Sequence, residues 1–169
     1  MALEPTQTDH SPPAGQRSEP SAGGLLGAIA SAVLAISVFL AWYTVHWQIA
    51  GAGHSEAVNG WDATNVARVV FVFALIGLGA LAIELFSASS ELPVPASIVS
   101  GVCGILAVLF IGYRIASAPD TKVSGLLGFT ALQNFISVSV DTSWGIWVSL
   151  AAAVAMVAGA VLALRGSRT

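Results

Sequence analysis

Four long apolar stretches, separated by polar or mixed segments, dominate the chain. They run roughly over Gly24–Trp42, Val66–Phe86, Ser97–Ala116 and Trp144–Leu164. A helix needs about 20 residues to cross a bilayer, and backbone groups within the hydrocarbon must pair inside the protein. The runs are continuously apolar rather than alternating, which argues against membrane-spanning strands. The pattern therefore predicts an all-α membrane protein, a bundle of four transmembrane helices.

The connecting segments define the domain organisation. Residues 1–22 hold four prolines among Ser, Thr, Gln and Gly, which predicts a disordered tail. The first apolar run exceeds the usual core of a signal peptide, about 7–15 residues, so we expect it to be retained as a helix. Residues 123–136 place apolar side chains near helical spacing, which fits either a short interfacial helix or a buried loop. The predicted organisation is a tail over 1–22, a four-helix transmembrane domain over 23–165 and a polar tail over 166–169.

Composition supports this class and excludes others. Hydrophobic residues make up 56% of the 169 positions and charged residues 9%, against about 25% charged in soluble domains. A net charge of −3 offers no basic face for nucleic acid. The single cysteine, Cys103, excludes an intramolecular disulfide and multi-cysteine metal centres.

The positive charges that flank the predicted spans do not fix the orientation. With both termini inside, Arg17, Arg165 and Arg168 lie in the cytoplasm, while Arg68, Arg114 and Lys122 lie at or beyond the outer boundary, three against three. The polar tail and the short connection over 87–95 lie on one side, and the longer loops lie on the other. We therefore expect a multi-pass protein of the cell (plasma) membrane with cytoplasmic termini.

Aromatic residues gather at one end of the predicted bundle. The group consists of both tyrosines, Tyr43 and Tyr113, and five tryptophans: Trp42, Trp47, Trp61, Trp144 and Trp147. One interpretation is a one-sided interfacial belt, since indole rings favour that depth. The other is an aromatic cap that packs the long loops against each other or against a partner, with Trp42, Trp47 and Trp61 at its centre.

Two arginines fall at the same predicted membrane level. Arg68 opens the second span and Arg114 closes the third, and each favours an acidic partner when partly desolvated. We predict that at least one of them pairs with Asp62, Asp120 or Asp141 beneath the aromatic residues.

Residues that could carry catalysis are scarce. The middle of the predicted spans offers only Ser31, Ser37, Ser100 and Cys103 as polar or thiol groups, whereas transporters usually bind substrate at polar-lined helices there. His46, His54 and Glu56 could hold a metal in principle, but their spacing matches no known ligand motif. We expect no catalytic, cofactor or metal site, and therefore no enzyme.

Small residues recur every four positions on three of the predicted helices. The stripes are Gly23, Gly27, Ser31 and Ala35, then Ala151, Ala155 and Gly159, and, with a wider gap, Ser100, Gly104 and Gly112. Small residues let membrane helices approach closely. This fits packing inside one bundle or association with another membrane protein.

Several short motifs resemble a group of uncharacterised four-helix membrane proteins from actinobacteria. They are Phe39-Leu-Ala-Trp-Tyr43, Asn59-Gly-Trp-Asp62, Leu92-Pro-Val-Pro95, Gly112-Tyr-Arg-Ile115 and Gly145-Ile-Trp-Val148. The resemblance covers roughly residues 25–165 and implies topology and membrane localisation, without an activity.

The functional expectation is a non-enzymatic integral membrane protein, an accessory or scaffolding component of the cell envelope. Its expected partners are the lipid bilayer and either a membrane protein or further copies of itself. The alternative is a subunit of a small oligomeric channel or transporter, in which several copies would supply the pathway.

Overall fold

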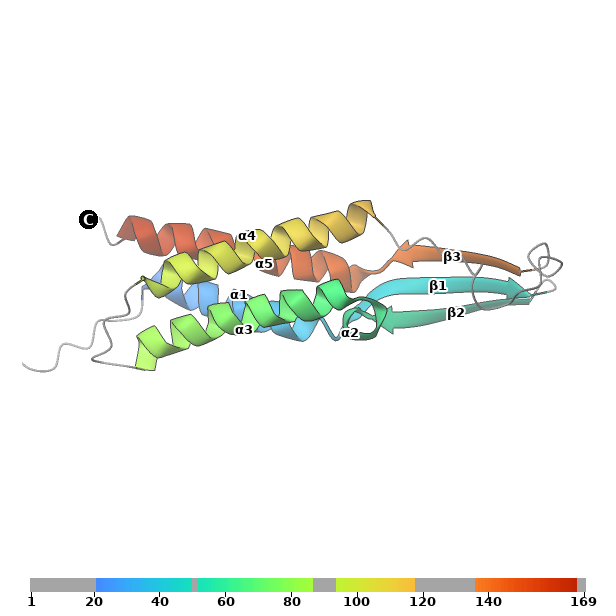
Figure 1. The fold of residues 1–169 in the computed structure, drawn as a ribbon, viewed down its shortest axis with the longest axis horizontal. Helices are drawn as coiled ribbons and strands as arrows, with labels where there is room; N and C mark the ends of the chain where they lie inside the picture. Colours follow the sequence, from blue (N-terminus) through green and yellow to red (C-terminus); the bar gives the residue numbers. More distant parts are fainter. Residues whose placement is uncertain (1–20, 50–51, 87–93, 118–135, 167–169) are drawn as a thin grey trace, which may run out of the picture.

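Four helices form an elongated bundle, and a small sheet extends from one end of it (Figure 1). The structure is a computed structural model that describes residues 21–49, 52–86, 94–117 and 136–166. The helices are α1 (Ala22–Ser37), α3 (Asn65–Phe86), α4 (Ala96–Ala116) and α5 (Trp144–Gly166). α1 and α4 each pack against both α3 and α5. The start of α1 and the end of α5 lie together, opposite the sheet.

Three of these helices are long and apolar enough to cross a membrane: Asn65–Glu84 within α3, then α4 and α5. Their bounds agree closely with three of the predicted spans. The prediction of four long spans is corrected at the first helix, because α1 has 16 residues and a spanning helix needs about 20.

The first helix ends five residues before Trp42, the predicted end of the first span. Beyond Ser37 the chain makes two tight turns, in which Phe39 N–H donates to the Ile36 carbonyl at 3.0 Å and Leu40 N–H donates to the Ser37 carbonyl at 3.1 Å. Bonds of this shorter spacing tighten the end of a helix. The chain then becomes extended at Ala41, so Trp42 belongs to a strand.

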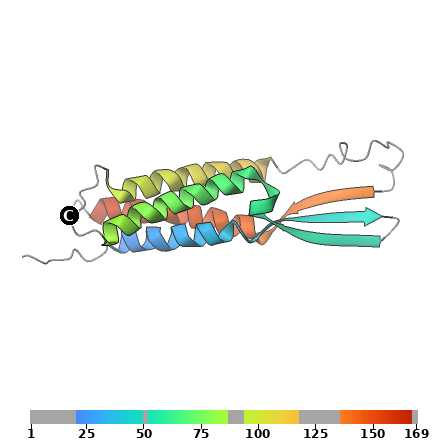
Figure 2. The ribbon, with the colours of Figure 1, turned by 60° about the horizontal axis from the view of Figure 1, so that its bottom comes forward.

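The prediction of an all-α fold is wrong, because the described residues include a three-stranded antiparallel sheet. Its strands are β1 (Ala41–Ile49), β2 (Ala52–Asn59) and β3 (Ile136–Thr142), in the order β2-β1-β3. A short helix, α2 (Gly60–Ala63), leads from β2 towards α3. Figure 2 shows the three strands projecting beyond the helices as one layer.

The sheet has two different faces. Successive strand residues point to opposite sides, so Tyr43, Val45 and Trp47 share one face of β1 and Thr44, His46 and Gln48 share the other. Val45 lies opposite Val140 in β3 on the first face. His46 lies opposite Ser55 in β2 and Ser139 in β3 on the second. One face is therefore mainly apolar and the other polar.

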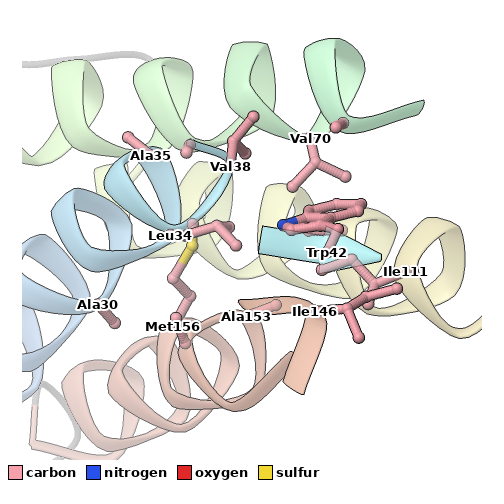
Figure 3. Close-up of a cluster of buried hydrophobic side chains, with 14 of the residues drawn as sticks. Ala30, Leu34, Ala35, Val38, Trp42, Val70, Ile111, Ile146, Ala153 and Met156 are labelled. Carbon is pink, nitrogen blue, oxygen red and sulfur yellow. The ribbon is translucent and has the colours of Figure 1, made fainter. Parts of the chain in front are cut away.

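One core runs through the bundle to the base of the sheet. Leu34, Val70, Ile111, Ile146 and Met156 are fully buried in it, and Figure 3 shows them converging from all four helices. Three predicted segments lie outside the described residues: most of the tail over 1–22, all but the last residue of the stretch over 123–136, and 167–169. Ile136, the last residue of that stretch, begins β3.

Candidate functional site

The junction between sheet and bundle concentrates the aromatic and charged residues that the sequence singles out. It begins with a bulge in β1, where the register with β2 shifts between Ala41 and Tyr43. A bulge re-aims side chains by inserting an extra residue into one strand. Because of it, two consecutive residues are both buried, Trp42 at 0% and Tyr43 at 2% exposure, although neighbours in a regular strand point to opposite faces.

Trp42 fills the end of the bundle. Its ring lies among Val70, Ile111 and Ile146 (Figure 3). Its indole Nε1–H donates to the Ser37 carbonyl at 3.0 Å. A Cβ at Gly60 would come within 2.7 Å of the indole ring, so only glycine fits there. Trp42 therefore joins α1, α2, α3 and the sheet at one point.

A second aromatic cluster lies around Trp61 in α2, just before the start of α3. Trp61 stacks on Phe39 at 5.5 Å between ring centroids and meets Phe71 edge-on at 5.5 Å. The Arg68 guanidinium lies 5.5 Å from the Trp61 ring centre. Its Nε donates to the Trp61 carbonyl at 3.3 Å, and its Nη1 donates to Asn65 Oδ1 at 3.4 Å. Arg68 thus has polar and aromatic partners within its own segment.

The second arginine is placed differently. The Arg114 guanidinium carbon lies over the Tyr43 ring, 5.9 Å from its centre. The Arg114 Nε and the Tyr43 hydroxyl are both buried, and neither has a hydrogen-bond partner among the described residues. From the sequence alone Tyr43 belongs only to the general aromatic group, because the bulge that buries it has no recognisable sequence pattern.

The structure does not bring either arginine to Asp62 or Asp141. Asp62 accepts a hydrogen bond from the Asn59 side-chain nitrogen at 2.9 Å, beside the N-terminus of α2. Asp141 lies 3.5 Å from His46 Nε2 on the polar face of the sheet. Within the described ranges this is the one contact at ion-pair distance. Asp120 lies outside them, so its pairing with an arginine stays a prediction.

The five tryptophans of the predicted cap have different environments. Trp42 is buried, Trp61 is half-buried in the Phe39 cluster, and Trp47 lies farther out on β1. Trp144 and Trp147, on the first turn of α5, are 60% and 51% exposed. The proposed centre of Trp42, Trp47 and Trp61 is therefore not one cluster: two of these residues pack at the bundle end and the third on the sheet.

The serines inside the bundle mostly bond to the protein itself. Ser31 Oγ donates to the Gly27 carbonyl at 2.8 Å. Ser37 Oγ and Ser149 Oγ lie 2.8 Å apart and link α1 to α5. Ser100 Oγ is buried without a partner, and Cys103 is a free, buried thiol.

The residues considered as metal ligands, His46, His54 and Glu56, lie in β1 and β2, and the two histidine side chains do not come together. His46 and His54 lie on neighbouring strands, but His54 is opposite Trp47 and His46 is opposite Ser55, so the two imidazoles lie on different faces. Among the described residues no group of three His, Cys, Asp or Glu side chains is arranged to hold a metal ion.

Most of the small-residue stripes face the interior of the bundle. A Cβ at Gly159 would come within 2.7 Å of the Gly27 backbone nitrogen, and one at Gly104 would come within 3.0 Å of Val157. Gly112 and Ala151 are exceptions, because a Cβ at Gly112 would meet nothing within 4 Å and Ala151 is exposed. Close approach of α1 to α5 therefore depends on glycine.

The side chains at the junction are better suited to binding a ligand than to catalysing a reaction. The junction combines aromatic rings, two guanidinium groups and one unpartnered phenol, which can hold an anion or a ring but form no nucleophile–base pair. No family model, curated protein or solved structure matches this chain. The resemblance to actinobacterial membrane proteins accordingly stays a prediction from the motifs.

Proposed function

We propose that this chain is a non-enzymatic integral membrane protein that acts as an accessory or scaffolding component of the cell envelope. One observation carries the proposal: a small sheet packs closely against the end of the bundle and projects beyond it (Figure 1). Trp42, Gly60 and Gly145 leave little space at that joint, since a Cβ at Gly145 would overlap the Ala41 carbonyl. A sheet that is packed closely against the bundle in this way is suited to presenting a fixed surface to another envelope protein.

In this proposal α3, α4 and α5 cross the plasma membrane, and the shorter α1 packs against α3 and α5 in the same bundle. The outer face of α1 is apolar, with Leu25, Ile29, Val33 and Ile36 between 41% and 64% exposed. Apolar groups on the outside of a helix suit contact with lipid. The start of α1 and the end of α5 share one end, which we assign to the cytoplasm, so that the sheet lies on the opposite side.

The interior of the bundle supports a structural role. Met156 and Gly77 come so close that a Cβ on the glycine would lie 2.8 Å from the methionine methyl carbon. Ser37 and Ser149 bond to each other rather than facing a pathway. A solute path through a single copy would require polar groups along a passage, and the described core offers little of either.

The alternative, a subunit of an oligomeric channel or transporter, requires a polar or glycine-lined seam between copies. Gly23, Gly27, Gly101, Gly104 and Gly159 are buried inside one copy, which leaves them unavailable for that seam. Flux of ions or small solutes through proteoliposomes, lost on Arg68→Ala or Arg114→Ala, would favour the alternative over the scaffold.

Site-specific photo-cross-linking in native membranes tests the scaffold proposal. A photoreactive residue at Ser55, exposed on the sheet, should give a discrete cross-linked partner, while the same residue at Glu84, exposed at the far end of α3, should not. Equal cross-linking at both positions, or none at Ser55, Ser139 and Gln48, would contradict the proposal. Carbonate extraction checks membrane insertion separately.

A further inference from the structure

Two neighbouring polar groups at the base of the sheet are buried and lack a hydrogen-bond partner within the part of the chain that the structure describes. The Tyr43 side chain is 2% exposed, and its hydroxyl makes no hydrogen bond. The Arg114 Nε is buried and also makes none, although its guanidinium carbon lies 5.9 Å from the centre of the Tyr43 ring. Buried polar groups are nearly always satisfied, so two adjacent exceptions require an explanation.

Both groups call for the same kind of partner. A guanidinium carries five N–H donors and no acceptor, whereas a phenol donates through its O–H and can also accept through its oxygen. A single negatively charged group with several oxygens could accept from both. Charge-assisted bonds of this type are the strong ones, and arginine matches the geometry of phosphate with two parallel N–H groups.

The other arginine at this end of the bundle is bonded within the protein. Arg68 lies at the same end of the bundle, yet it donates to the Trp61 carbonyl and to Asn65 Oδ1. No described acidic side chain lies within ion-pair distance of Arg114, since the ion pair within those ranges joins His46 to Asp141. The described acidic side chains therefore supply no acceptor for Arg114.

The surroundings identify a lipid as its source. Arg114 lies in the last turn of a 21-residue apolar helix, which places it near one boundary of a hydrocarbon core about 30 Å thick. Tyr113 and Trp144 at this end are 62% and 60% exposed, as is typical of aromatic residues at headgroup depth. Phospholipid phosphates lie at that depth.

We propose that Tyr43 and Arg114 form a binding site for the phosphate group of a membrane phospholipid. The guanidinium holds two phosphate oxygens, and the phenol O–H donates to one of them from beneath. The lipid would then brace α4 against β1. The site rests on the proposed membrane location, but it does not depend on the scaffold role.

Thermal unfolding of the full chain in detergent, titrated with phosphatidylglycerol, tests the site. The lipid should raise the midpoint for the wild type and for Arg68→Gln. Its apparent Kd should weaken roughly tenfold or more in Arg114→Gln and several-fold in Tyr43→Phe, which keeps the ring. Diacylglycerol, which lacks the phosphate, should have no effect.

Three results would overturn the proposal. Equal stabilisation by diacylglycerol would assign the effect to the acyl chains, and stabilisation by inorganic phosphate alone would assign it to a free anion. The third result is that, without lipid, Asp120→Asn lowers the thermal midpoint as far as Arg114→Gln does, and that added lipid changes the midpoint of neither variant. The acceptor for Arg114 would then be the Asp120 carboxylate. Carbonate extraction and cross-linking from Ser55 should be unchanged in Arg114→Gln, so failure here is distinguishable from failure of the membrane or scaffold proposal.

Discussion

Ser37 on α1 and Ser149 on α5 place their hydroxyl oxygens 2.8 Å apart, although the residues are separated by 112 positions. Ser37 also donates to the Leu34 carbonyl at 2.7 Å, and Ser149 to the Gly145 carbonyl at 2.9 Å. The two serine hydroxyl groups therefore share two protons among three hydrogen-bond contacts: one to each carbonyl and one between the serines. When one serine is replaced, the other can still donate its hydroxyl proton to the carbonyl group in its own helix.

A double-mutant cycle should measure this link. We expect Ser37→Ala and Ser149→Ala each to lower the free energy of unfolding by about 1 kcal/mol, with a coupling energy of about 0.6 kcal/mol, the average for hydrogen bonds between membrane helices. Reversible unfolding in mixed micelles gives these values. Ser31→Ala combined with Ser149→Ala is the control and should be additive, since Ser31 bonds within α1. Additive effects for Ser37 and Ser149 would contradict the link.

The crossing of α1 and α5 should tolerate no side chain at Gly159. Its Cβ would lie 2.7 Å from the Gly27 nitrogen, so Gly159→Ala must separate the helices, at a cost of about 1–3 kcal/mol. Gly79→Ala is the matched control, because a Cβ there meets nothing within 4 Å. The control should be neutral or stabilising by up to about 1 kcal/mol, through helix propensity. Similar thermal midpoints for the two variants would refute the close crossing.

Trp42→Phe should destabilise the joint between sheet and bundle. The change removes the indole bond to the Ser37 carbonyl and part of a fully buried ring, for an expected loss of about 1–3 kcal/mol. Thermal unfolding followed by circular dichroism gives the loss. Trp147→Phe, on an exposed position of α5, serves as the comparison. A loss no larger than that of Trp147→Phe would show that Trp42 does not hold the joint.

The two junction arginines should matter more than the arginine at position 168. We expect Arg68→Gln to lower the thermal midpoint, because it loses the Trp61 carbonyl bond and the contact with the Trp61 ring. Arg114→Gln should lower the midpoint in lipid-containing micelles. Arg168→Gln, near the C-terminus, should have little effect. Equal, negligible shifts for all three would leave the junction arginines as simple headgroup contacts.

The three long spans could be predicted because each carries its own signal. Continuous apolar runs of spanning length define a helix without reference to the rest of the chain, and α3, α4 and α5 begin within one residue of the predicted starts. The end of α1 could not be predicted in the same way. Trp42 is as apolar as a helix residue, but its position is set by the bulge and by Gly60, both of which depend on the tertiary structure.

The sequence does carry a pattern typical of these strands, but the long apolar runs beside it make the pattern easy to miss. Tyr43, Val45 and Trp47 alternate with Thr44, His46 and Gln48, and residues 136–141 alternate in the same way, which is typical of half-exposed strands. The first series adjoins a long apolar run, however, and although β2 follows it directly, its second partner strand, β3, lies some ninety residues away. Pairing over that separation leaves no local mark. The neighbouring Tyr43 and Arg114 groups could not be predicted for the same reason.

The strand order β2-β1-β3 has a consequence for biogenesis. Chains are made from the N-terminus, so the β1–β2 hairpin is complete while α3, α4 and β3 are still to be synthesised. Until β3 has been synthesised, one edge of β1 has no partner strand, and an unpaired strand edge can pair with other chains. The last strand closes that edge immediately before α5, the helix that completes the bundle, leaves the ribosome. A nascent chain stalled before Ile136 therefore offers a quality-control factor an exposed strand that the finished protein hides.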